Sequence, residues 1–195
     1  MQIGPVADVL LFHHAQGLTS GVLAFADDLG AAGHTVHAPD LYDGKTFDDL
    51  NDGVAYAREV GFDTILERGR AAADDLASEL VYAGFSLGVM PAQMLAQTRP
   101  GAQGALLMSA ALPASEFGDG WPDGLAGQIH LMTGDEWAAE DLPAARELTA
   151  AADDVELFLY DGDSHLFADK SLPDYDATAS ALLIARVRLF LDDLG

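Results

Sequence analysis

Short apolar runs alternate along the chain with longer segments whose apolar residues recur at helical spacing. The apolar runs predict strands at residues 7–13, 35–38, 80–85, 104–109, 128–133 and 155–160, and the periodic segments predict helices at residues 20–32, 48–59, 62–79, 87–98, 143–152 and 176–194. Such alternation is typical of a parallel sheet covered by helices on both faces. The sequence therefore predicts one α/β domain over residues 1–195, built on a mostly parallel sheet of about six to seven strands.

One segment, residues 112–127, interrupts the alternation of predicted strands and helices because it is rich in Gly, Pro and Asp. It follows the predicted strand 104–109, and loops at the carboxyl edge of an open sheet shape ligand pockets. Phe117, Trp121 and Trp137 are the aromatic residues nearest in sequence to that edge. Each is a candidate for lining a pocket or, alternatively, a hydrophobic anchor. The chain leaves no room for a large inserted cap, which predicts an open pocket and a small substrate.

The most informative motif is Gly-Phe-Ser-Leu-Gly at residues 84–88, between the predicted strand 80–85 and the predicted helix 87–98. A Gly-x-Ser-x-Gly turn strains the backbone of its serine, and a β-carbon at Gly84 or Gly88 would collide with the neighbouring strand or helix. Ser86 would stand exposed at the sheet edge, where the amino end of the helix stabilises negative charge on a substrate oxygen. The motif favours acyl transfer, and the alternative is an ordinary strand-to-helix turn.

A serine nucleophile needs a base to take its proton, and the base needs a third group to orient it. His165 follows the predicted strand 155–160 in a polar loop, and Asp135 follows the predicted strand 128–133 in a turn. Both therefore lie at carboxyl ends of strands, and the chain order Ser, Asp, His is that of α/β-hydrolases. Two alternatives stay open: Glu136 adjoins Asp135 and competes for the orienting role, and His165 would otherwise be a solvated loop side chain.

Asp161 and Asp163 precede His165 in a stretch that superficially resembles the start of a calcium-binding loop. No further Asp-x-Asp-Gly pattern or distal glutamate follows, so the pattern indicates such a loop only weakly. The chain has no cysteine, which removes disulfides and thiolate metal sites. We therefore expect neither a metal ion nor another cofactor.

Several segments together resemble the dienelactone hydrolase family over nearly the whole chain. They are residues 9–18 (Val-Leu-Leu-Phe-His-His-Ala-Gln-Gly-Leu), 38–42 (Ala-Pro-Asp-Leu-Tyr), the motif at 84–88, 133–135 (Thr-Gly-Asp) and 160–167 (Tyr-Asp-Gly-Asp-Ser-His-Leu-Phe). The resemblance implies an α/β-hydrolase fold without a large cap, with Ser86 as nucleophile, Asp135 as orienting acid and His165 as base. It also implies an oxyanion hole formed by the backbone N–H groups of Ala15 and Leu87.

The chain departs from that family's pattern in ways that bear on the substrate. The name-giving enzymes use a cysteine nucleophile, which this chain lacks, and place a glutamate in the first loop, where His14 stands here. His14 and Gln16 are candidate pocket residues; His13 and His14 line the pocket in this interpretation or, alternatively, merely end the strand. Family members also hold a substrate carboxylate with arginines, one of them shortly after the catalytic histidine, where this chain has Asp169. Because Asp169 would repel a carboxylate, we expect a neutral or cationic ester rather than an anionic lactone.

Acidic residues dominate the charge of the chain, with 32 Asp and Glu against nine Lys and Arg and a formal net charge of −23. Such a surface repels phosphate backbones and anionic lipids, which argues against nucleic-acid and membrane partners. Residues 1–8 lack the basic region and apolar core of a signal peptide, and the apolar runs are too short to span a bilayer. We expect a cytoplasmic protein that is a monomer or homodimer.

Taken together, these features predict a serine hydrolase that cleaves a small carboxylic ester or lactone through an acyl-enzyme intermediate. The partner of the protein in this interpretation is that small molecule. One alternative is a non-catalytic binding or regulatory module that kept the fold, because a fold alone does not prove activity. A second is a different α/β enzyme, such as a doubly wound nucleotide binder, and the lack of a Walker sequence or a Gly-x-Gly-x-x-Gly after the first strand argues against it.

Overall fold

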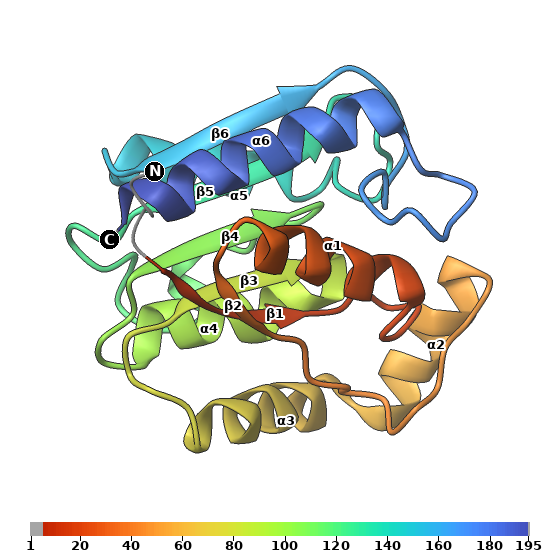
Figure 1. The fold of residues 1–195 in the computed structure, drawn as a ribbon, viewed down its shortest axis with the longest axis horizontal. Helices are drawn as coiled ribbons and strands as arrows, with labels where there is room; N and C mark the ends of the chain where they lie inside the picture. The colour runs from red at the N-terminus through yellow and green to blue at the C-terminus, as the bar shows by residue number, and fades with distance from the viewer. Residues whose placement is uncertain (1–5, 195) are drawn as a thin grey trace.

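The computed structural model describes residues 6–194, which contain one sheet of six parallel strands (Figure 1). The strands are β1 (Asp8–Phe12), β2 (Thr35–His37), β3 (Val81–Phe85), β4 (Gly104–Met108), β5 (Gly127–Met132) and β6 (Val155–Tyr160). Their order across the sheet is β2-β1-β3-β4-β5-β6, so β3 lies inside it and is paired on both sides. Since every pair is parallel, the carboxyl ends share one edge, at the right in Figure 1. The predicted mostly parallel sheet is confirmed.

Helices cover both faces of this sheet. They are α1 (Ser20–Ala31), α2 (Leu50–Val60), α3 (Phe62–Asp74), α4 (Val89–Thr98), α5 (Leu142–Ala151) and α6 (Ala177–Asp193). The helices α1 and α6 bury apolar side chains against one face, and α2, α3, α4 and α5 do so against the other. Apart from two short 3₁₀ turns, residues 6–194 form no further helix, so no large cap lies over the sheet edge. None of these helices combines the length and hydropathy that a bilayer crossing requires.

The helix α3 ends at Asp74, earlier than the end predicted at residue 79. Arg99, which follows α4, donates hydrogen bonds to the backbone carbonyls of Ala73, Leu76 and Ala77 at 2.9, 3.0 and 2.8 Å. Carbonyls at the end of a helix have no intrahelical partner, so the Arg99 guanidinium stabilises the chain where it leaves α3. Local apolar spacing cannot reveal a cap supplied by a distant residue, which is why the predicted helix was too long.

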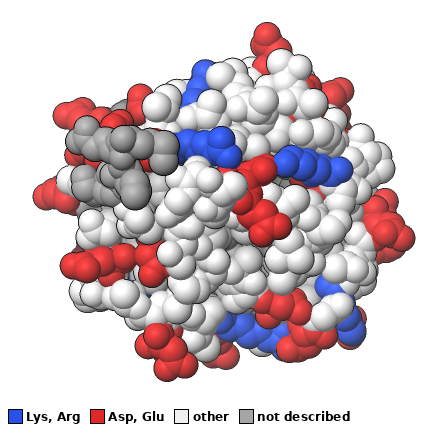
Figure 2. Space-filling view, in the orientation of Figure 1, with Lys and Arg blue, Asp and Glu red and all other residues white. Residues whose placement is uncertain are grey.

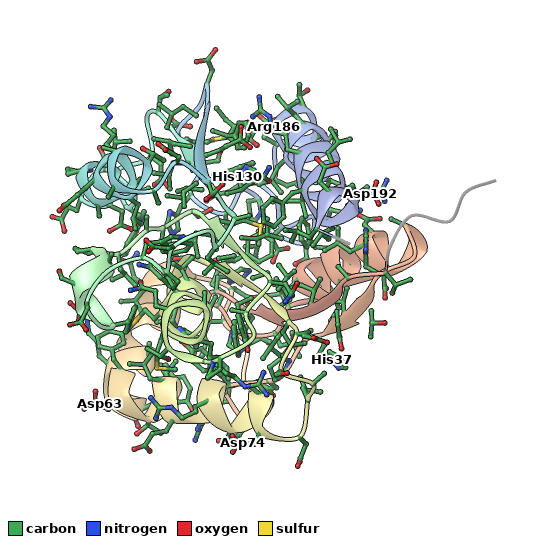
Figure 3. The ribbon with its side chains drawn as sticks, turned by 90° about the vertical axis from the view of Figure 1, so that its left-hand side faces the viewer. His37, Asp63, Asp74, His130, Arg186 and Asp192 are labelled. Atoms are coloured by element: carbon green, nitrogen blue, oxygen red, sulfur yellow. The ribbon has the colours of Figure 1, made fainter. Side chains whose placement is uncertain are left out.

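A buried cluster of polar and aromatic side chains connects β5, β6 and α6. The ring of His130 stacks on Phe158, with Nδ1 2.8 Å from the Tyr160 hydroxyl and Nε2 3.2 Å from Gln128 Oε1. Burial lowers the pKa of His130 to about 3, and the positive charge of the nearby Arg186 acts in the same direction (Figure 3). His130 is therefore neutral and serves the packing of this side of the sheet.

Candidate active site

Ser86 lies at the turn between β3 and α4, in a left-handed backbone conformation with a φ of 49°. A β-carbon added to Gly84 would lie 2.1 Å from the carbonyl oxygen of Gly88. One added to Gly88 would lie 2.4 Å from the carbonyl oxygen of Phe12 and 2.6 Å from that of His13. The steric reason for the two glycines is thus confirmed, and the close approach packs the serine turn against the end of β1.

Ser86, His165 and Asp135 form a continuous chain of hydrogen bonds. Ser86 Oγ lies 2.7 Å from His165 Nε2, and His165 Nδ1 lies 2.6 Å from Asp135 Oδ2. A carboxylate can only accept hydrogen bonds, so Nδ1 carries the ring proton and its N–H donates a hydrogen bond to Asp135. Nε2 is then unprotonated and accepts a hydrogen bond from the Ser86 hydroxyl. His165 and Asp135 are both buried. The arrangement is therefore competent to remove the proton of the Ser86 hydroxyl.

Of the two adjacent acids, the structure places Asp135 at the imidazole. The second carboxylate oxygen of Asp135 accepts a hydrogen bond of 2.9 Å from the backbone N–H of Trp137, which fixes the side chain in its turn. Asp135 is 3% exposed, whereas the Glu136 side chain is exposed to solvent. The geometry thus favours Asp135 over Glu136 for orienting His165.

A hollow of about 210 Å³ opens beside Ser86. Its lining is mostly apolar and consists of Ser86, Leu87, Met90, Ser109, Ala110, Leu112, Trp137, Asp141 and His165. Pockets for drug-sized ligands are usually about 300 Å³ or larger, so this hollow suits a smaller molecule. A larger hollow of about 430 Å³ lies beside residues 100–103, at the opposite edge of the sheet and away from Ser86. The hollow beside Ser86 is therefore the candidate substrate pocket.

Among the aromatic residues predicted to line the pocket, Trp137 does so, and Phe117 and Trp121 do not. The indole N–H of Trp121 donates to the backbone carbonyl of Leu125 at 2.8 Å, and its ring lies beside Gly127 at the start of β5. Phe117 packs against the core cluster on the α4 side of the sheet. The pocket prediction is wrong for both because each anchors the loop 112–127 to the domain.

His14 and Gln16 also lie away from the pocket lining, which corrects their predicted role. The backbone N–H of Gln16 donates to His14 Nδ1 at 3.2 Å, so His14 carries its proton on Nε2 and donates to Asp169 Oδ2 at 2.8 Å. The side-chain amide of Gln16 donates to the carbonyl of Phe47 at 3.0 Å. Both side chains are buried and hold the loop that follows β1.

Asp169 faces this loop rather than the pocket. Its carboxylate accepts hydrogen bonds from His14, from Thr19 Oγ1 at 2.5 Å, and from the Ser171 backbone and hydroxyl at 2.8 and 2.6 Å. Burial acts to raise the pKa of Asp169, but the hydrogen bonds from His14, Ser171 and Thr19 outweigh it and lower the pKa to about 2. Asp169 is 4% exposed and does not line the hollow. The expectation that Asp169 repels a substrate carboxylate is therefore wrong.

The loop after β1 lies next to the serine turn. The backbone N–H of Ala15 donates to no backbone carbonyl within residues 6–194. The helix α2 packs closely against this loop, since a β-carbon on Gly53 would lie 2.2 Å from the Ala15 carbonyl oxygen. Leu87 is the second residue of the short 3₁₀ turn Ser86–Gly88, whose first backbone N–H groups lack intrahelical partners. These two N–H groups are the candidates for an oxyanion hole.

Asp141 is the acidic lining residue that the sequence did not reveal. It directly precedes α5 and is one of 24 aspartates in the chain, with no motif to distinguish it. Burial raises the pKa of Asp141 to about 6, although the backbone N–H of Ala111 and the proximity of His165 act to lower it. A partly buried carboxylate with a perturbed pKa in a cleft is a candidate functional group.

Comparison with known proteins agrees with this architecture. The sequence model of the dienelactone hydrolase family matches residues 2–194. Among solved structures, a dienelactone hydrolase-like promiscuous phosphotriesterase from metagenomic libraries is 21% identical with a TM-score of 0.79, covering 98% of this chain and 87% of that chain. Mouse α/β-hydrolase domain-containing protein 10 is 15% identical with a TM-score of 0.71, covering 98% of this chain and 92% of that chain. No curated protein matches the sequence. The fold is that of the α/β-hydrolases.

Proposed function

Because this chain belongs to the dienelactone hydrolase family, we propose that it is a serine hydrolase that cleaves a small carboxylic ester or lactone through an acyl-enzyme intermediate. The observation that carries the proposal is the hydrogen-bonded chain from Ser86 Oγ through the His165 ring to Asp135. A base within hydrogen-bond reach of a serine, and itself oriented by a carboxylate, is the arrangement that activates such a nucleophile.

In the first half of the reaction, Ser86 Oγ attacks the carbonyl carbon of the ester while His165 Nε2 takes the hydroxyl proton. The carbonyl oxygen becomes negatively charged, and the backbone N–H groups of Ala15 and Leu87 stabilise it. When the tetrahedral intermediate collapses, His165 returns the proton to the leaving alcohol oxygen. The acyl group stays bonded to Ser86, and in a lactone the alcohol remains part of the same molecule.

In the second half, His165 takes a proton from water, whose oxygen attacks the acyl carbon. The tetrahedral intermediate then collapses, the bond between the acyl carbon and Ser86 Oγ breaks, and His165 gives its proton to Ser86 Oγ as the carboxylic acid leaves. Asp135 keeps its negative charge throughout, holds the ring in the productive tautomer and stabilises the imidazolium. No step of this scheme calls on a metal or a cofactor.

The buried Asp169 positions the loop that carries Ala15, so we expect Asp169→Asn to lower both stability and turnover. With a folded pKa of about 2 against an ordinary value of 3.8, the carboxylate contributes about 2 kcal/mol near pH 7. Because the folded pKa is depressed, this stability is present above about pH 4 and is lost as the pH falls towards 2. Ester turnover should fall about tenfold, because a small displacement of an oxyanion donor weakens its hydrogen bond.

Urea unfolding at pH 7 and at pH 3 measures the stability effect, which should shrink at the lower pH. Asp153→Asn is the matched control, because Asp153 is an exposed acid in the loop before β6. It removes the same charge and should leave unfolding and turnover nearly unchanged. An Asp169→Asn protein as stable as the parent at pH 7 would contradict this role for the carboxylate.

The proposed activity is tested by incubating the purified protein with short-chain p-nitrophenyl esters and lactones and by labelling it with a fluorophosphonate. We expect turnover of the shortest esters, because the hollow of about 210 Å³ admits only small acyl groups. Covalent labelling should occur at Ser86 and be blocked by Ser86→Ala. A protein that neither labels nor turns over any ester would favour a non-catalytic binding module.

A further inference from the structure

The candidate pocket holds an acidic side chain that the reaction scheme does not use. Asp141 lines the hollow together with Ser86 and His165, at the residue that directly precedes α5. No Lys or Arg lines the hollow, and none within residues 6–194 forms an ion pair with Asp141. A partly buried carboxylate without a cationic partner is costly to keep, since burial penalises the charged form.

An aromatic ring lies in the same pocket. Trp137 lines the hollow beside Ser86, and its ring centroid lies 6.0 Å from that of His165. Its side chain remains 45% exposed, so much of the indole is free to contact a bound molecule. The face of an indole attracts cations, most strongly where water is partly excluded. A carboxylate and an indole around one small hollow form a site whose chemistry matches an ammonium group.

The approach to the pocket is lined by acidic residues and is therefore negatively charged, like Asp141 inside it. A second hollow of about 330 Å³ adjoins the first at Trp137 and His165, and its other lining residues include Glu136, Asp163 and Asp174. No Lys or Arg lines it. Figure 2, which looks onto α1 and α6 rather than onto this sheet edge, shows acidic side chains interspersed with several basic ones. Clefts lined by one sign of charge concentrate ligands of the opposite sign.

We propose that Asp141 and Trp137 together bind a cationic group of the substrate, so that the enzyme prefers small esters that carry an ammonium group. This inference rests on the proposed ester hydrolysis at Ser86 and names the substrate class of that site. An ammonium group bound in the hollow supplies the positive charge that the structure does not place beside Asp141. A substrate carboxylate in the same position meets an uncompensated negative charge and is excluded.

The proposal predicts a ranking among esters that differ only in charge. Three p-nitrophenyl esters share a leaving group and an acyl chain length, and their acyl chains end in a trimethylammonium group, a tert-butyl group or a carboxylate. The trimethylammonium and tert-butyl groups have nearly the same shape, so their comparison isolates charge. We expect kcat/KM to be about tenfold higher for the cationic ester than for the neutral one, and lower again for the anionic ester, because charges a few ångströms apart near a protein surface interact by more than 1.4 kcal/mol.

Asp141→Asn tests whether this preference comes from the pocket. The cationic ester should lose about tenfold in kcat/KM and the neutral one less than about twofold, because asparagine keeps the shape and removes the charge. Asp153→Asn is the control, since Asp153 is exposed in the loop before β6, beside Trp121 and away from Ser86. It changes the net charge equally and should preserve the ranking. Burial raises the pKa of Asp141, so the asparagine variant should unfold at no lower a temperature than the parent.

The pH dependence provides an independent measurement. The titratable groups that influence Asp141 are His165, Asp135 and Glu140, and they act on both substrates alike. The ratio of kcat/KM for the cationic ester to that for the neutral ester therefore cancels the titration of His165. A quaternary ammonium does not titrate, so the ratio should decline as the pH falls through about 6 and Asp141 gains a proton. In Asp141→Asn the ratio should be independent of pH.

The outcomes separate this inference from the activity on which it rests. Failure to hydrolyse any of the three esters would overturn the proposed hydrolase function. Hydrolysis at equal rates for the three charges, or a preference for the cation that survives Asp141→Asn, would overturn the role of Asp141 and leave the hydrolase assignment standing. A cation preference that Asp141→Asn removes and Asp153→Asn retains would support the proposal.

Discussion

Ser86→Ala is expected to lower ester turnover by roughly 10⁴-fold or more while leaving the fold intact. The variant keeps His165 and Asp135 but has no oxygen to form the acyl-enzyme, so only residual catalysis by the pocket remains. Ser86 already holds a φ of 49°, and alanine meets that conformation with a side chain of similar size. Steady-state rates with a short p-nitrophenyl ester measure the loss, and thermal unfolding checks the fold.

A second serine in the same pocket offers a matched control. Ser109 is buried, lines the hollow and also has a left-handed backbone conformation, with a φ of 64°. It makes no hydrogen bond to His165, whose Nε2 is paired with Ser86. Ser109→Ala should therefore change turnover by less than about tenfold. Equal losses in the two variants, or activity of Ser86→Ala within tenfold of the parent, would show that the nucleophile has been misassigned.

The sequence was sufficient to predict the residues whose positions follow from the direction of the strands in the sheet. Strands of a parallel sheet end at one edge, so three polar residues that each follow an apolar run were expected to meet there, and Ser86, Asp135 and His165 do lie within hydrogen-bond reach. The glycines at 84 and 88 were likewise predictable, because close contact between a strand and a helix is a local consequence of the turn. Local chemistry and sheet direction together therefore located this candidate site.

Contacts between distant loops were not predictable in the same way. His14 and Asp169 replace residues that the family pattern has in the same two loops, and each was interpreted alone as a pocket group. In the structure they are hydrogen-bonded to each other across a sequence separation of 155 residues. The two side chains therefore pair with each other inside the domain. Only the tertiary structure shows this, because nothing in either loop specifies its partner.

Because contacts between loops could not be predicted, the sequence also assigned the wrong acidic residue to the pocket. Asp169 was expected to repel anions from the pocket, whereas Asp141 is the acid that lines it. Both are aspartates in polar stretches after strands, and the sequence offers no periodicity that would separate a buried carboxylate from a solvated one. The loop 112–127 behaves similarly, because Trp121 binds back onto its own loop and leaves the pocket lining to Leu112. Loop conformation decides these positions, and it depends on contacts across the fold.

The second large effect is expected at the orienting acid, where Asp135→Asn should reduce turnover by about 10³ to 10⁴-fold. Asparagine fits the same space, but its side-chain N–H₂ can donate to His165 Nδ1. The ring would then carry its proton on Nε2, where it cannot accept from the Ser86 hydroxyl. The variant should fold normally, because the backbone N–H of Trp137 still finds an oxygen acceptor.

Glu136→Gln is the companion variant, since it removes one carboxylate charge from the adjacent residue. Glu136 is exposed, and the 2.6 Å contact to His165 Nδ1 is made by Asp135, so this change should alter turnover by less than about threefold. Proton NMR of the two variants would add a direct test, because the strongly hydrogen-bonded Nδ1 proton should disappear from its downfield position only in Asp135→Asn. If Glu136→Gln were the damaging change instead, the orienting acid would lie one residue further along the chain, while Ser86 and His165 would keep their proposed roles.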